Sequence, residues 1–168
     1  MSELHAEVTA LRKLAGEWAG GGRGDFPTID AFRYTETLRF YWNGVEPMLQ
    51  FEQRTWVANE ADPLEDPLHW ETGFFRALPG FGVELTNAQN GERVEVMRGK
   101  IESRGNIVVL SMDSTLLGND ERLIGSRRRY ECEGDTLRYQ VWMATTKQPE
   151  LTLHLEARLI RRNPVSAP

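Results

Sequence analysis

The chain of 168 residues has a single cysteine, Cys132, and so cannot form an internal disulfide. It has no apolar run long enough to span a membrane, and residues 1–7 lack the basic and then apolar order of a secretory signal. A chain without disulfide, leader or membrane span suits a reducing compartment. We therefore expect a cytoplasmic protein.

The sequence also lacks an excess of positive charge. Its net charge is −5 at pH 7, and charges of both signs are interspersed. Such a surface favours neither phosphate backbones nor anionic lipids, so we expect no nucleic-acid and no membrane partner. The run Arg127-Arg128-Arg129 does not change this, because its side chains alternate faces in a strand. We expect ordinary cross-strand ion pairs there.

Helical periodicity is confined to the N-terminus. Ser2 can cap a helix, and apolar side chains then recur at three-to-four spacing before Gly16. These side chains are Leu4, Val8, Leu11 and Leu14. The pattern predicts one short amphipathic helix, whose narrow apolar stripe is suited to covering one open end of a barrel.

Beyond the helix, the pattern changes to a two-residue period. Apolar and polar side chains alternate over residues 32–42, and Asn43-Gly44 then predicts a tight hairpin turn with positive φ. Further extended segments are predicted at 48–57, 68–77, 83–87, 94–102, 107–114, 123–132, 137–145 and 151–161. Turn dipeptides such as Gly105-Asn106 separate many of them. The acidic segment 59–67 has no period and is predicted to be an exposed loop.

With the opening segment, this pattern gives about ten antiparallel strands joined by short turns. We predict an all-β fold, a ten-stranded antiparallel up-and-down β-barrel with a short N-terminal capping helix, forming a single domain over residues 1–168. Closing the sheet leaves no unpaired edge. A two-sheet sandwich is the structural alternative, but the regular hairpin spacing favours the barrel.

The three histidines show no zinc-binding spacing. His5 belongs to the terminal helix and is expected to be solvated. His69 is followed by Glu71 on the same strand face, so a surface pair is the default and a pocket-edge role the alternative. Alternation directs His154 away from the core, so a ligand role would need an open, polar barrel end or a bulge that turns the side chain.

No catalytic triad is recognisable. Cys132 lies in an ordinary strand beside Glu131 and Glu133, which would raise its pKa. The run Gly20-Gly21-Gly22-Arg23-Gly24 is a poor phosphate loop, because it precedes a strand rather than a helix. Its glycines are expected to let the first strand bend and let Trp18 enter the core.

The pattern Gly16-x-Trp18-x-Gly20-x-Gly22, followed by Phe26-Pro27-Thr28-Ile29, resembles the opening signature of the nitrobindins. Other segments fall in the order and approximate spacing of that family, so the resemblance covers residues 14–162. They are Gln53-Arg54-Thr55-Trp56, residues 67–73, Asp135-Thr136-Leu137-x-Tyr139, Met143-Ala144 and His154-Leu155.

The resemblance implies a fatty-acid-binding-protein-like barrel that carries one haem b per subunit. His154 matches the sole protein ligand to ferric iron, and Leu68 and His69 match the segment lining the opposite haem face. Thr28 lies beside the pocket, and Met143 falls near a pocket methionine. The implied activity is isomerisation of peroxynitrite to nitrate, with reversible binding of nitric oxide, by a monomer or homodimer. No general acid or base is required.

Three features depart from the family pattern. Phe26 replaces a tyrosine, Trp70 is bulky enough to crowd the site or lie outside it, and the loop 59–66 is long and acidic. Some relatives lack the haem-binding histidine, so the retained His154 favours haem. Two alternatives remain: a carrier of a small lipophile or of haem without turnover, and a nitric-oxide-sensing module.

Overall fold

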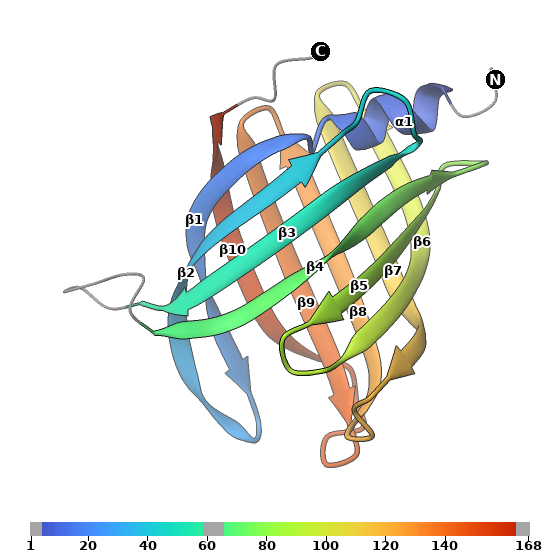
Figure 1. The fold of residues 1–168 in the computed structure, drawn as a ribbon. Coiled ribbons are helices and arrows are strands. Elements are labelled where there is room, and N and C mark those ends of the chain that lie inside the picture. Colours follow the sequence, from blue (N-terminus) through green and yellow to red (C-terminus); the bar gives the residue numbers. More distant parts are fainter. Residues whose placement is uncertain (1–4, 59–65, 164–168) are drawn as a thin grey trace.

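The computed structural model describes residues 5–58 and 66–163 (Figure 1). Its elements are α1 (His5–Arg12), β1 (Gly16–Phe26), β2 (Ile29–Tyr41), β3 (Met48–Val57), β4 (Pro67–Leu78), β5 (Gly82–Gln89), β6 (Val94–Arg104), β7 (Ile107–Gly118), β8 (Leu123–Glu133), β9 (Thr136–Thr145) and β10 (Thr152–Asn163). The expected cap at Ser2 and nearly all of the loop 59–66 lie outside the described residues. Within the described ranges, no helix combines the length and apolar character that a membrane crossing requires.

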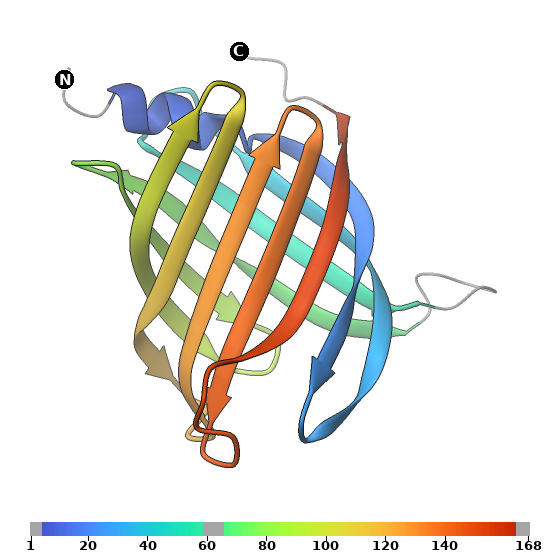
Figure 2. The same cartoon turned by 180° about the vertical axis from the view of Figure 1, so that it is seen from behind.

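The ten strands form a closed barrel in which each strand pairs antiparallel with its sequence neighbour. Closure comes from β1, which pairs with β2 on one side and with β10 on the other. The predicted all-β, up-and-down barrel is therefore confirmed, and the sandwich alternative is wrong. Figures 1 and 2 show the continuous wall from two opposite sides.

The interior is divided along the barrel axis. Near α1 it is apolar, with Phe40, Phe51 and Phe75 packed ring against ring at centroid distances of 5.0 to 6.3 Å. Helix α1 lies across this end of the barrel (Figure 1), and Leu11 and Leu14 are buried in the same core cluster, as the amphipathic pattern predicts. Further along the same strands, the inward positions become polar. The apolar core therefore fixes the barrel at one end and leaves the other end for a site.

One predicted turn is wrong. The connection between β2 and β3 is not a two-residue hairpin, because residues 42–47 all lie outside the strands. Only Gly44 of the expected pair has positive φ, at 86°. Asn43 instead accepts hydrogen bonds through Oδ1 from the backbone of Val45 and Glu46. An Asx-type turn thus replaces the tight turn, because the asparagine side chain competes for the backbone donors.

Candidate functional site

The barrel wall opens at the end opposite α1. Pairing between β1 and β10 stops at Gly24 and Leu155. Beyond this point the β1–β2 hairpin diverges from the start of β10, as Figure 2 shows. The pairing of β10 with β9 shifts register between Leu153 and Leu155, which makes His154 the extra residue of a β-bulge.

This bulge reverses the side-chain direction that simple alternation gives for His154. The imidazole does not point away from the barrel but lines two adjoining cavities inside its open end. Phe26 and Phe32 pack edge-on against it, with ring centroids 5.6 and 6.4 Å from the imidazole. A bulge was one of the two conditions under which His154 could act as a ligand, and the structure contains that bulge.

The hydrogen bond at Nδ1 of His154 determines which nitrogen is free. Nδ1 lies 3.2 Å from the carbonyl oxygen of Asp25, and a carbonyl can only accept, so Nδ1 carries the proton. Burial lowers the pKa of His154, and the positive charge of Arg93 acts in the same direction. The ring is therefore neutral at pH 7, with an unprotonated Nε2. That is the form in which imidazole binds a metal.

The two cavities have volumes of about 310 and 350 Å³, within the range of small-molecule sites. They share four lining residues: Ile29, Arg93, Met143 and His154. A larger hollow of about 610 Å³ lies over the β1–β10 wall, and its lining includes the five arginines Arg23, Arg33, Arg129, Arg138 and Arg158. It includes neither His154 nor Met143, so we place the candidate site at the inner pair.

The structure brings the predicted site residues together around these cavities. Leu68 and His69 line the first, Thr28 lines the second, and Met143 and His154 line both. They come from β4, the β1–β2 turn, β9 and β10, so closure of the barrel unites positions far apart in sequence. His69 and His154 therefore face the same first cavity from β4 and β10.

The glycine motif makes room for aromatic rings. A Cβ on Gly22 would lie 2.6 Å from Cζ of Tyr34, and one on Gly24 would collide with the ring of Phe32. Both rings line the first cavity. The motif thus lets β2 lay two aromatic side chains across β1. Trp18, as expected, is buried in the core, where its indole donates to the carbonyl of Leu14 at 2.8 Å.

The departures at Phe26 and Trp70 leave the cavity open. Phe26 is buried against His154 and contributes an apolar wall where the family has a tyrosine. Trp70 faces outward, is 46% exposed, and stacks with the guanidinium of Arg54 at 4.2 Å. Trp70 lines neither cavity, and Phe26 packs against one side of the His154 ring while both cavities remain.

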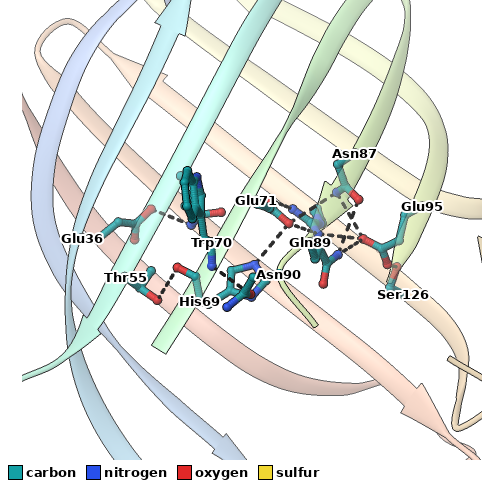
Figure 3. Close-up of polar contacts among 12 residues, drawn as sticks. Glu36, Thr55, His69, Trp70, Glu71, Asn87, Gln89, Asn90, Glu95 and Ser126 are labelled. Atoms are coloured by element: carbon teal, nitrogen blue, oxygen red, sulfur yellow. Dashed lines mark hydrogen bonds and ion pairs between the residues drawn. The ribbon is translucent and has the colours of Figure 1, made fainter. Parts of the chain in front are cut away.

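The pair of His69 and Glu71 lies inside the barrel, so the default expectation of a surface pair is wrong. His69 Nε2 is 3.4 Å from Glu71 Oε2, and Glu71 is only 1% exposed. Glu71 also forms a two-pronged ion pair with Arg128, whose second partner is Glu95 at 2.7 Å. Figure 3 shows His69, Glu71 and Glu95 of this group.

The environment of this group keeps its carboxylates charged. Burial alone would raise the pKa of Glu71, but Arg128 and His69 outweigh it and lower the pKa to about 2. For Glu95 the same balance of burial against Arg128 lowers the pKa. Ser126 and Gln89 donate further hydrogen bonds to Glu95 at 2.7 and 3.0 Å. The floor of the first cavity is therefore a fixed ionic network.

A second interior group is uncharged at neutral pH. Glu36 accepts hydrogen bonds from Gln53 and Tyr139, each at 2.6 Å, and Tyr139 contacts the hydroxyl of Tyr34 at 2.7 Å. Burial, assisted by the like charge of Glu71, raises the pKa of Glu36 to about 8. At neutral pH the Glu36 carboxyl is therefore protonated and adds no charge to this group.

Glu36→Gln is expected to stabilise the protein increasingly as pH rises. Below the usual pKa of 4.5, Glu36 is protonated in both folded and unfolded chains and has no effect. Between 4.5 and about 8 only the unfolded chain loses the proton, so wild-type stability falls with pH and then levels off. The cost removed by glutamine is on the order of 4 kcal/mol at pH 8. Urea unfolding across this range measures it.

The matched control for Glu36→Gln is Glu133→Gln, at an exposed strand end. Its unfolding free energy should follow the wild-type pH profile. If the unfolding free energy of Glu36→Gln also paralleled that of the wild type from pH 5 to pH 8, the Glu36 carboxyl would be ionised in the folded barrel.

Sequence reasoning missed these interior groups, although a signal for them exists. Glu36 shares its strand face with Leu38 and Phe40, and Arg128 shares its face with Tyr130. A charged residue in phase with buried aromatic neighbours therefore marks an inward position. The expected cross-strand pairing is confirmed for Arg127, which contacts Asp113 at 2.7 Å, whereas Arg128 pairs across the interior.

A closed barrel with an inner cavity, a neutral histidine at its mouth and apolar walls defines a small ligand-binding β-barrel protein. Comparison with known families makes this specific. The model of the family described as THAP4-like, heme-binding beta-barrel domain matches residues 7–161. The chain belongs to this family, and the resemblance to the nitrobindins is confirmed.

Similar proteins carry a common name. A protein named peroxynitrite isomerase Rv2717c, from Arabidopsis thaliana, is 36% identical over 92% of this chain and 88% of its own length. Peroxynitrite isomerase 1 of Rhodococcus jostii is 38% identical over 91% of this chain and 83% of its own. The crystal structure of Rv2717c from M. tuberculosis superposes with a TM-score of 0.84 at 33% identity, covering 93% of this chain and 97% of that one.

Proposed function

We propose that this protein binds haem b, one per subunit, through His154 and isomerises peroxynitrite to nitrate, with reversible binding of nitric oxide at the same iron. The observation that carries the proposal is the bulge at His154, which turns a neutral imidazole with a free Nε2 into the cavity. The names of the relatives support the same activity.

The cavity residues fit a large, flat and mostly apolar group. Phe32, Val141 and Leu155 line the first cavity, and Met143 lines both. The free Nε2 of His154 is a suitable donor for iron, and the Asp25 carbonyl fixes its ring orientation. When bound, ferric haem would supply a Lewis-acidic iron with one position left for a small ligand, and with it the chemistry that rearranges peroxynitrite.

The remaining roles belong to the chain itself. Leu68 and His69 line the cavity on the β4 side, and we assign them to the haem face opposite His154. Leu68 and Met143 would provide apolar walls that limit water around a small ligand, while Thr28 borders the second cavity. Isomerisation of the peroxynitrite anion to nitrate neither takes up nor releases a proton overall. The reaction therefore asks for no general acid or base among these side chains.

The proposal predicts that protein loaded with ferric haem accelerates peroxynitrite decay about tenfold or more over the apoprotein and shifts the products toward nitrate. Stopped-flow absorbance measures the decay, and the nitrate-to-nitrite ratio measures the products. Free ferric haem at the same concentration is the control. If peroxynitrite decayed no faster with the haem-loaded protein than with free haem, the protein would be a carrier of haem or of a lipophile without turnover.

A further inference from the structure

Arg93 holds a special position in the candidate site. It lies between β5 and β6 and lines both cavities, together with Ile29, Met143 and His154. Of these four shared residues, it is the only one with a permanent charge. His154 lines the same two cavities, so the guanidinium and the imidazole border a common space. A ligand that spans both cavities would therefore meet Arg93.

The hydrogen bonds of Arg93 are incomplete. Nη2 pairs with Asp120 Oδ2 at 2.6 Å, whereas the buried Nε–H has no acceptor within the described ranges. Buried donors in native proteins nearly always have a partner, so an orphaned guanidinium N–H beside a cavity indicates that the acceptor comes from outside the chain.

The charged residues around the second cavity determine which kind of acceptor would suit the free Nε–H of Arg93. The second cavity is lined by three cationic side chains, Arg93, Arg122 and Lys147, and by one carboxylate, Asp120. Hydrogen bonds from Arg122 and Arg93 hold the pKa of Asp120 well below its usual range, so this carboxylate remains charged and is already engaged. An excess of positive charge remains at the rim of an apolar cavity. An anionic acceptor is favoured there.

We propose that Arg93 binds a carboxylate of the ligand, and that this contact makes the site selective for porphyrins with free propionate groups. The proposal rests on the proposed function and assigns to Arg93 a role in cofactor recognition. The guanidinium would present Nε–H to the propionate while Asp120 keeps Nη2 in place.

A fatty acid offers the same carboxylate on an apolar body, so the experiment compares both sources. The apoprotein is titrated with ferric haem, with its dimethyl ester, with palmitate and with methyl palmitate. Porphyrin binding is followed by the Soret band and lipid binding by tryptophan fluorescence. The variants are Arg93→Gln and Arg93→Lys. The control is Arg104→Gln, at the far end of β6, where the side chain is 86% exposed.

Arg93→Gln is expected to weaken haem binding roughly tenfold or more, the effect of one charge-assisted hydrogen bond, and to leave the affinity for the dimethyl ester unchanged. An unchanged ester affinity also shows that the cavity is intact. Arg93→Lys should retain part of the haem affinity, and Arg104→Gln all of it.

Three results would overturn the assignment. Equal losses of affinity for haem and for its ester would show that Arg93 is a structural residue. No loss of affinity for either would show that Arg93 takes no part in ligand recognition. A loss for palmitate alone would assign the carboxylate to a lipid. If the wild-type protein bound neither porphyrin, the proposed function itself would fail, and that outcome is separate from haem binding that ignores Arg93.

Discussion

His154→Ala is expected to lower the affinity for ferric haem by about a hundredfold or more and to abolish the wild-type Soret band. The substitution removes the imidazole that the bulge directs into the cavity and leaves the apolar walls in place. Residual porphyrin binding should therefore persist with an altered spectrum. Since His154 makes one side-chain hydrogen bond to the described part of the chain, at Asp25, the barrel should lose only about 1 kcal/mol of stability.

The matched control for His154→Ala is His69→Ala, which removes a histidine from the wall of the same cavity. This variant should keep the wild-type Soret position, because the proposal places His69 on the face opposite the iron ligand. Added imidazole should restore the spectrum of His154→Ala by occupying the space of the missing ring. If His69→Ala lost haem while His154→Ala kept it, the assignment of the ligand would be reversed.

The sequence predicted the barrel because its signals were local. The helix ends at Arg12, before Gly16, turn glycines at Gly105 and Gly134 have φ of 61° and 56°, and alternation between turns fixes the strand faces. Each of these features depends on residues within a few positions of one another. The predicted turn between β2 and β3 was wrong because the Asn43 side chain offered an alternative to the tight backbone turn.

The direction of His154 could not be predicted from local pattern. Its face depends on a register shift between β9 and β10, which no periodicity within β10 alone specifies. Only the family resemblance pointed to the cavity. The free N–H of Arg93 is likewise a property of two turns brought together by the barrel, since Arg93 follows β5 and Asp120 follows β7. Non-local geometry, rather than side-chain chemistry, limited the prediction of the site.

The interior ionic network has a large expected effect on stability. In Arg128→Met, Glu71 and Glu95 would stay buried without their counter-ion, which typically costs about 3–5 kcal/mol. Arg128 is only 6% exposed, so water cannot replace the lost charge. The control is Arg127→Met on the outer face, where the side chain is 51% exposed and pairs with Asp113. Its cost should stay below about 1 kcal/mol.

The pH dependence separates this electrostatic cost from a packing defect. In the wild type, Arg128 lowers the pKa of Glu71 to about 2, so its stabilisation is full above the usual 4.5 and disappears as pH falls toward 2. In Arg128→Met, burial would raise both carboxyl pKa values above 4.5, and stability would fall as pH rises. The penalty measured by urea unfolding should therefore be smaller at pH 5 than at pH 7. Replacing Glu71 and Glu95 with glutamine in the same variant should recover most of it, whereas a penalty independent of pH would show that Arg128 acts mainly by filling space.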